Sequence, residues 1–407
     1  MKVLVAMSGG VDSTVTAYIL KKEGHEVIGV NFTFVDDASA SSIDSELDEI
    51  AKKLDIKIIY KDFRIEFKEK VISSFVSDYE HGLTPNPCAI CNNSMKFNKL
   101  LQIMKEENCD MMATGHYANV VHPNYYCIKK SDNIQKDQSY MLYRLSQEQL
   151  SHIIFPIGNM NKNDVRKIAC EVGLKVAEKK DSQDVCFIKN ISYQEFIKRY
   201  EFGSDYKEKI ASGSLKEDDI TARNYLKKGE FVDTSGNVLG FHNGIINYTI
   251  GQRKGLNIAF GERKFVANID AEKNQVVLTD NDGLMKDYFF VSDIVFSGMD
   301  EIELKSRINH NSTFSEKNIE VQKMLYAKLR YRHDGTECKD FEIVDFDELD
   351  KKEQDSILQY ANSQNANSLN KLILKCNLVA PVRAITPGQS AVFYDGEGKV
   401  MFGGRIL

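Results

Sequence analysis

Short apolar runs alternate with helical stretches over about the first 190 residues of the chain. The apolar run 3–6 precedes a helical pattern over 13–23. Gly24 follows this pattern, at the position where a residue in the left-handed conformation commonly ends a helix. Further strands are expected between helices of 3.6-residue periodicity, at 27–32, 56–60 and 111–114. This alternation is typical of a parallel sheet with helices on both faces.

After about residue 205 the pattern changes to short β runs separated by Gly, Asn and Asp. The segments GEFVDTSGNVLGFHNG (229–244) and KFVANIDAEKNQVVLTD (264–280) predict antiparallel hairpins, and 390–407 predicts strand, turn and strand. Residues 340–375 are polar with a partly helical pattern, so we expect an insertion between strands there. An α/β domain followed by mainly β structure is the predicted fold class.

Length, composition and net charge limit the classes of protein to which the chain can belong. A length of 407 residues suggests two or three domains. No apolar run approaches the roughly 18 residues of a membrane span, and no export signal opens the chain, so we expect a cytoplasmic protein with no membrane partner. The net charge of −6 means that any RNA binding must rest on local basic patches. Eight cysteines in a reducing compartment indicate catalysis or metal binding where they cluster.

The segment MSGGVDS (7–13) links the first predicted strand to the first helix. Glycines let the backbone approach phosphate oxygens, and a helix N-terminus supplies free N–H groups and partial positive charge. The segment has neither the lysine of a Walker A loop nor the spacing of a dinucleotide loop. Asp12 suits a phosphate site if Mg²⁺ bridges its carboxylate to the phosphates. The alternative is an ordinary turn in which Asp12 caps the helix.

Two segments hold cysteines in a distinctive setting. TPNPCAICNNSMKF (84–97) places Cys88 and Cys91 at the start of a helix, where a thiol is expected to have a lowered pKa. DSQDVCFI (181–188) places Cys186 in an apolar run after a polar loop. The remaining cysteines are expected to be buried and structural: Cys109, Cys127, Cys170, Cys338 and Cys376.

The pattern S-G-G-x-D-S after a first strand resembles the PP-loop pyrophosphatases, which cleave ATP between the α and β phosphates. With the two cysteine segments, four more motifs make the chain similar, nearly end to end, to the tRNA-specific 2-thiouridylase family: ATGHYA (113–118), KDQSYMLY (136–143), YTIGQRKGL (248–256) and PVRAITPGQSAVFY (381–394). The resemblance implies a PP-loop catalytic domain over 1–204, a β-rich tRNA-binding domain over 205–282 and a β-barrel domain over 283–407.

In that family the C2 oxygen of uridine 34 in tRNA is replaced by sulfur. ATP activates this oxygen as an adenylate, and a cysteine persulfide delivers the sulfur. The resemblance implies that Cys186 carries the persulfide and that Cys91 is the partner thiol. It also implies the tRNAs for Lys, Glu and Gln as substrates, and as partner a sulfur donor such as a cysteine desulfurase or a sulfur relay protein.

Two other functions compete with this one. A small-molecule amidotransferase or synthetase on the PP-loop fold would need neither Cys186 nor C-terminal β domains with RNA-contact motifs. A non-catalytic RNA-binding protein would not need the intact loop from Ser8 to Ser13.

The resemblance further implies which residues contact the substrates. ATP is expected at Ala6, Met7, Ser8, Gly9, Gly10, Val11, Asp12 and Ser13, and on its adenosine side at Phe32 and Gly115. Phe32 departs from the methionine that is usual in the family. The target base is expected at Asn86, Pro87 and Cys88, and the rest of the tRNA at His116, Lys136, Asp137, Gln138, Arg330, Tyr331 and Gln389. Arg253 and Lys254 are either phosphate contacts or residues of a solvated turn.

Cys88 departs from the family pattern, which has an aspartate there in its best-known members. Cys88, Cys91 and Cys186 would be three soft ligands, and three thiolates with an open fourth position suit a [4Fe–4S] cluster whose free iron binds sulfide. Alternatively, Cys88 merely replaces the aspartate. The persulfide route, for which the family is better known, is the default expectation.

Overall fold

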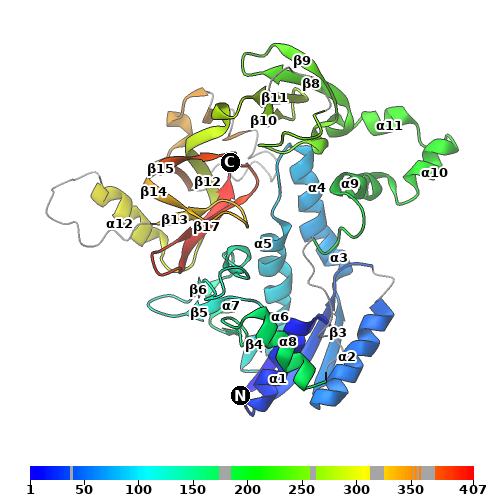
Figure 1. Cartoon of the computed structure of the whole chain (residues 1–407), viewed down its shortest axis with the longest axis vertical. Helices are drawn as coiled ribbons and strands as arrows, with labels where there is room; N and C mark the ends of the chain where they lie inside the picture. Colours follow the sequence, from blue (N-terminus) through cyan, green and yellow to red (C-terminus); the bar gives the residue numbers. More distant parts are fainter. Residues whose placement is uncertain are drawn as a thin grey trace.

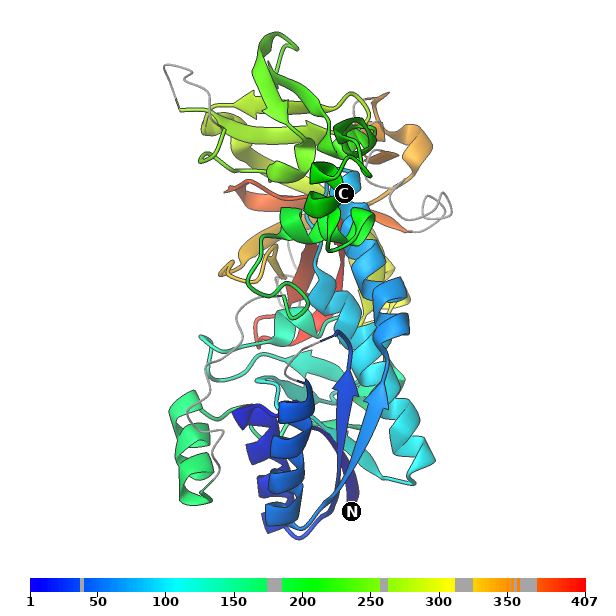
Figure 2. The same ribbon diagram turned by 90° about the vertical axis from the view of Figure 1, so that its right-hand side faces the viewer.

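We describe the chain from a computed structural model, which places residues 1–36, 40–173, 185–256, 263–311, 325–351, 353–354, 357–358 and 372–407. Two predicted features lie partly outside these ranges, namely the Cys186 segment at 181–184 and the 340–375 insertion at 352, 355–356 and 359–371. The molecule is elongated, with a parallel sheet at one end, a four-stranded sheet at the other and a barrel between them (Figures 1 and 2).

The N-terminal sheet is parallel throughout, with strand order β3-β2-β1-β4-β7. Its strands are β1 (Lys2–Ala6), β2 (Glu26–Thr33), β3 (Lys57–Asp62), β4 (Met111–Ala113) and β7 (Ile153–Ile154). Side chains alternate between the faces of β1, so Val3 and Val5 pack against one set of helices and Leu4 against another. Those helices are α1 (Val11–Lys22), α2 (Ala40–Leu54) and α8 (Lys162–Glu171) on one face and α6 (Asn98–Glu106) on the other. The predicted α/β fold is confirmed.

Two helical runs lead away from this sheet, and each contains a π-helical segment. The first is α3 (Arg64–Phe67), η1 (Lys68–Ile72) and α4 (Ser73–Glu80); the second is α5 (Pro87–Cys91), η2 (Asn92–Phe97) and α6. The apolar stripe of the first run, including Phe67, Phe75 and Tyr79, packs against Phe231 and Val266 of the four-stranded sheet. This shared core connects the two ends of the molecule, and Figure 2 shows the helices extending from the parallel sheet toward the other end.

The four-stranded sheet has the order β10-β11-β8-β9. Its strands are β8 (Lys228–Asp233), β9 (Val238–Asn243), β10 (Phe265–Asp270) and β11 (Gln275–Thr279). Both predicted hairpins are antiparallel, but they meet through a parallel β11–β8 pair. Three helices precede the sheet: α9 (Tyr193–Phe202), α10 (Tyr206–Ala211) and α11 (Glu217–Thr221).

The C-terminal strands close into a barrel in the order β12-β15-β14-β13-β16-β17, with antiparallel pairs throughout. They are β12 (Met285–Phe296), β13 (Tyr326–Lys328), β14 (Thr336–Val344), β15 (Ile373–Arg383), β16 (Ser390–Tyr394) and β17 (Val400–Ile406). The strand, turn and strand predicted for 390–407 is confirmed. The predicted bounds of the insertion are wrong, because 340–344 complete β14 and 373–375 begin β15, and residues 342–344 pair with 373–375 across the two strands.

Several short elements complete the described chain. They are β5 (Asn119–Val121), β6 (Cys127–Lys129), η3 (Ser139–Met141), α7 (Gln147–Leu150), η5 (Asn224–Leu226), η6 (Ile245–Asn247), η7 (Asp282–Leu284), α12 (Glu301–Asn311) and η8 (Phe346–Glu348). In the described ranges, no helix is both long and apolar enough to cross a membrane. The domain boundaries at 204 and 282 stay a prediction.

Candidate active site

A cavity of about 450 Å³ lies where β1, β2 and β4 end. The loop after β1 contributes Ser8, Asp12 and Ser13 to its wall. All three cysteines of the distinctive segments line the same cavity, namely Cys88, Cys91 and Cys186. Although Cys91 and Cys186 are about 95 residues apart in sequence, the fold brings both to the phosphate loop.

The loop has the conformation of an anion site. Gly9 has a φ of +71°, which favours glycine, and α1 begins at Val11 with Gly10 as its N-cap. The Ser8 N–H donates to the Ser13 hydroxyl at 3.2 Å, and that hydroxyl donates to the Gly10 carbonyl at 3.1 Å. Asp12 therefore lies inside the helix rather than capping it, so its carboxylate is free of the capping role that the alternative interpretation gave it.

The loop packs closely against β2 and against the segment that follows β4. A Cβ on Gly115 would lie 2.8 Å from the Asp12 carbonyl carbon and 2.8 Å from the Ser13 nitrogen, so only glycine fits at the end of β4. The buried Asn31 amide donates to the Met7 carbonyl at 2.7 Å, which ties the loop to β2. Phe32, beside it, lines the cavity and lies in an aromatic cluster with Phe34 and Phe63. Gly115 and Phe32 therefore both lie at the cavity, and their contact with adenosine stays a prediction.

Asp12 has two partners that the sequence did not indicate. The Lys162 ammonium lies 2.9 and 2.7 Å from the two carboxylate oxygens, and the Tyr117 hydroxyl donates to one of them at 2.8 Å. Lys162 comes from the start of α8, about 150 residues along the chain, in a segment that carries no motif. Its charge compensates that of Asp12, so the pair brings no net charge to the loop.

The cysteines are positioned by different elements. Cys88 and Cys91 lie in α5, whose N-cap is Asn86 and whose first residue is Pro87, a favoured helix start. Cys186 lies in a turn closed by the Ile188 N–H donating to the Val185 carbonyl at 2.9 Å.

Phe187 anchors that turn. Its buried ring lies against Phe67, Phe75 and Phe196, with centroids 5.8, 5.1 and 5.1 Å away. Cys186, in contrast, has an exposed side chain in the cavity wall. The anchor therefore holds a reachable thiol at the cavity.

The prediction that a helix N-terminus lowers the thiol pKa is wrong for this structure. Burial raises the pKa of Cys88, and raises the pKa of Cys91 to about 12. Surrounding protein atoms also displace water from the Cys186 thiol and raise its pKa, although the residue is exposed at the cavity. Loss of hydration disfavours the thiolate more strongly than the helix N-terminus favours it. The nearby Lys96 ammonium acts in the opposite direction on all three thiols and also lines the cavity.

Replacing Lys96 by methionine should slow alkylation of the three cavity cysteines. Without the ammonium the thiol pKa values rise further, so less thiolate forms at mildly alkaline pH, and we expect an about three- to tenfold lower rate. Mass spectrometry after iodoacetamide treatment measures each cysteine separately. Cys170, exposed on α8 and outside the cavity, is the internal control. Equal rates in the variant and the parent at Cys88, Cys91 and Cys186 would contradict this role of Lys96.

The other cysteines follow the prediction with one exception. Cys109, Cys127, Cys338 and Cys376 are buried, whereas Cys170 is exposed. The prediction for Cys170 is wrong because the buried face of α8 is formed by Val165 and Ala169, and Cys170 points away from it.

The metal-ligand hypothesis is not confirmed and stays a prediction. Within the part of the chain that the structure describes, no three His, Cys, Asp or Glu side chains are arranged to hold a metal ion. Cys88, Cys91 and Cys186 share a cavity without forming such a set.

The residues predicted to contact tRNA fall into different settings. His116 lines the cavity, its Nδ1 lies 2.7 Å from the Thr114 hydroxyl, and burial lowers its pKa well below the usual value, so the ring is neutral at neutral pH. Gln138 also lines the cavity, and its Oε1 accepts from the Tyr117 N–H at 3.0 Å. Asp137 is only 4% exposed and accepts from Ser131 and Ser139, so its side chain orders the turn.

The remaining predicted contacts lie nearer the surface. Arg330 and Tyr331 are exposed at the turn after β13, Lys136 is half-buried, and Arg253 and Lys254 are exposed in a turn. Gln389 and Asn86 make contacts between the barrel and the N-terminal domain.

Comparisons with known proteins bear on the whole chain. Three family models match: tRNA methyl transferase HUP domain (1–190), tRNA methyl transferase PRC-barrel domain (220–280) and aminomethyltransferase beta-barrel domain (361–406). Among solved structures, the U34-tRNA thiolase NcsA from Methanococcus maripaludis with its [4Fe-4S] cluster has a TM-score of 0.32 and 16% identity, over 56% of this chain and 74% of that one. That overlap is too small to transfer a mechanism.

The curated relatives match along the full length. The tRNA-specific 2-thiouridylase MnmA of Lachnoclostridium phytofermentans is 37% identical over 100% of this chain and 99% of its own. The protein of the same name from Clostridioides difficile is 35% identical over 100% and 98%. The chain therefore belongs to the MnmA family of tRNA-specific 2-thiouridylases.

Proposed function

We propose that this protein is a tRNA uridine 2-sulfurtransferase that acts on wobble uridine 34 and uses ATP and a cysteine persulfide. The observation that carries the proposal is the single cavity in which the loop from Ser8 to Ser13 meets Cys91 and Cys186. The names of the full-length relatives support the tRNA substrate and the thiolation. A phosphate loop alone would suit many ligases, and a cysteine pair alone would suit many redox enzymes. Their combination suits activation followed by sulfur transfer.

The first step in the proposal is adenylation. The C2 oxygen of the uridine attacks the α-phosphorus of ATP, the bond to the β-phosphate oxygen breaks, pyrophosphate leaves and the base loses its N3 proton. The backbone N–H groups at the start of α1 and the Ser8 hydroxyl face the phosphates, while Lys162 offsets the charge of Asp12 and so limits its repulsion of the phosphates. Oxygen bonded to AMP is then a good leaving group.

The second step transfers sulfur. The terminal sulfur of a Cys186 persulfide attacks C2, and AMP leaves with the former C2 oxygen. Cys91 then gives up its thiol proton, which balances the proton taken up at N3, and its sulfur attacks the Cys186 sulfur; the sulfur–sulfur bond breaks, and its electron pair stays on the sulfur bound to C2. The base regains a proton at N3 as 2-thiouridine. A Cys91–Cys186 disulfide remains, which an external thiol reductant must open before a sulfur donor reloads Cys186.

The metal groups considered from the sequence fit unequally. Mg²⁺ that enters with the ATP phosphates would meet Asp12 through water or by displacing Lys162, because that ammonium already contacts both carboxylate oxygens. Among the described residues no three such side chains are arranged to hold a single metal ion, and the proposed steps involve no cluster.

Iron reconstitution separates the two roles considered for Cys88. After anaerobic treatment with iron and sulfide, we expect no stoichiometric iron in the protein, and Cys88→Asp should retain thiolation activity. The parent and the variant are compared for iron content, visible absorbance and 2-thiouridine formation. Stoichiometric iron with a broad visible absorbance, lost together with activity in Cys88→Asp, would instead establish the cluster.

The proposed function has a test in cells. The tRNAs for Lys, Glu and Gln from a strain that lacks this protein should lose 2-thiouridine at position 34 and regain it when the parent gene is returned. A nucleoside profile that is unchanged by the deletion would contradict the proposal. In the strain to which the parent gene has been returned, the genes of candidate sulfur donors are then deleted one at a time. The deletion that again removes 2-thiouridine identifies the partner that loads Cys186.

A further inference from the structure

We infer that the C-terminal barrel positions the segment that carries the target-base contacts and Cys88, through the barrel loop formed by residues 387–390. For its activity readout this inference rests on the proposed function. Residues 84–88, the base segment, lie directly before Cys91. The barrel therefore affects thiolation by holding this segment in place. This effect is separate from any contact that the barrel itself makes with tRNA.

The base segment depends on the barrel for its hydrogen bonds. Residues 84–86, which precede α5, form no regular structure, and Pro85 and Pro87 lack an N–H group that could donate a backbone hydrogen bond there. The barrel loop supplies the missing partners. The Thr84 N–H donates to the Pro387 carbonyl at 3.0 Å, and the Gln389 amide nitrogen donates to the Thr84 and Pro85 carbonyls, each at 3.0 Å. Both amide hydrogens of Gln389 are thus used within the protein.

Asn86 relays this contact to the cysteine helix. Its side-chain oxygen accepts from the Ala89 N–H at 3.4 Å and so caps α5, while its amide nitrogen donates to the Ser390 hydroxyl at 3.0 Å. Asn86 is buried, and the Ser390 carbonyl is fixed in turn by the Tyr140 hydroxyl at 2.8 Å. One side chain therefore joins the start of the Cys88–Cys91 helix to the barrel.

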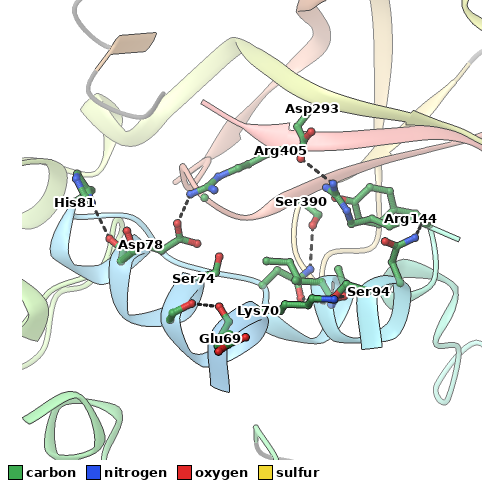
Figure 3. A pocket seen from close by; sticks show the side chains of 18 residues that line it. Glu69, Lys70, Ser74, Asp78, His81, Ser94, Arg144, Asp293, Ser390 and Arg405 are labelled. Atoms are coloured by element: carbon green, nitrogen blue, oxygen red, sulfur yellow. Dashed lines mark hydrogen bonds and ion pairs between the residues drawn. The ribbon is translucent and has the colours of Figure 1, made fainter. Parts of the chain in front are cut away.

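Two ion pairs fix how the barrel sits on these helices. Arg405 pairs with Asp78 at 2.6 Å, and Arg144 pairs with Asp293 at 2.7 Å. Figure 3 shows both pairs, with Ser390 between them, along a cavity of about 640 Å³. Because the Asp78 side chain is only 2% exposed, this contact is part of the folded interior and not a loose surface pair.

Gly388 makes the close approach possible. Its φ is +88°, and a Cβ there would lie 2.9 Å from both the nitrogen and the oxygen of Thr84, where neither backbone atom can yield without moving the base segment. Gly398, in another turn of the same barrel, has a similar φ of +78°. A Cβ on Gly398 would meet only the Lys130 side chain, at 3.5 Å. Gly388→Ala and Gly398→Ala therefore carry the same backbone strain and differ in their contact with the base segment.

The full-length Gly388→Ala and Gly398→Ala variants test the inference by three measurements. These are single-turnover formation of 2-thiouridine at saturating tRNA, the dissociation constant for tRNA, and amide hydrogen exchange over 84–91. We expect Gly388→Ala to slow thiolation about 10- to 100-fold relative to Gly398→Ala, because displacement of a reacting group lowers the rate of the reaction. The tRNA affinities of the two variants should be equal within about twofold, because such a displacement leaves binding unchanged. Exchange over 84–91 should become faster in Gly388→Ala alone.

Equal thiolation rates in the two glycine variants would overturn the inference, as would weaker tRNA binding with an unchanged rate at saturation. Ser390→Ala serves if Gly388→Ala does not fold. It removes the acceptor for Asn86 and should slow thiolation and speed exchange at the Ala89 amide, whereas no change in either would overturn the inference. If the parent protein forms no 2-thiouridine, the proposed function fails, and the exchange measurements still decide whether the barrel orders the base segment.

Discussion

Cys186→Ser should accept no labelled sulfur and form no 2-thiouridine, while it still releases pyrophosphate from ATP in the presence of tRNA. Serine cannot form a persulfide, but the phosphate loop and Lys162 lie on other elements and are left intact. Because Phe187 anchors the turn, the substitution should not displace the segment. The expected outcome is complete loss of the second step with the first step preserved.

Radiolabelled sulfur from a persulfide donor and a pyrophosphate assay measure the two steps separately. Cys170→Ser is the matched control, since it removes an exposed cysteine outside the cavity and should change neither step. Label retained on the Cys186→Ser protein would show that another cysteine is the carrier.

Asp12→Ala should lower ATP-dependent adenylation by about 100-fold or more, because charged groups placed in a phosphate site contribute effects of that order. The fold should persist, since an acidic side chain in the first turn of a helix contributes only about 0.3–1 kcal/mol. Removal of the carboxylate leaves the Lys162 ammonium without its main partner in the described loop and removes the predicted contact with Mg²⁺.

Lys162→Met distinguishes these two causes. A role through Mg²⁺ predicts that Asp12→Ala alone raises the magnesium concentration needed for half-maximal rate. A role through the ion pair predicts equal losses in both variants with an unchanged magnesium requirement. Asp164→Ala, in the first turn of α8, is the control for a lost acidic residue at a helix start. Undiminished pyrophosphate release by folded Asp12→Ala would exclude any function of this carboxylate in the first step.

The sequence was most informative where local chemistry decides the structure. The helix end at Gly24 and the hairpins after residue 229 follow from turn residues, and the parallel sheet follows from the alternation of patterns. The parallel pairing of β11 with β8 is not visible in the sequence, because a hairpin pattern specifies its own two strands but not the strand of the next hairpin beside it.

The candidate site also combines features that the local sequence predicts with features that only the folded structure shows. The loop and the cysteines were found from motifs. Lys162 and Asn31 were not, since each comes from a segment without a distinctive motif, and Lys96 was missed although it lies in the segment 84–97 that holds Cys88 and Cys91. The thiol pKa shifts were predicted with the wrong sign because the helix start is visible in sequence and the burial of the cavity is not.

One measurement tests the central claim most directly. The purified protein is incubated with ATP, magnesium, a persulfide donor and unmodified tRNA for Lys, and position 34 is then analysed by mass spectrometry while AMP and pyrophosphate are counted. The proposed function predicts 2-thiouridine at position 34 alone, with one AMP and one pyrophosphate formed for each sulfur inserted. An unmodified uridine 34, or sulfur inserted without AMP formation, would contradict it.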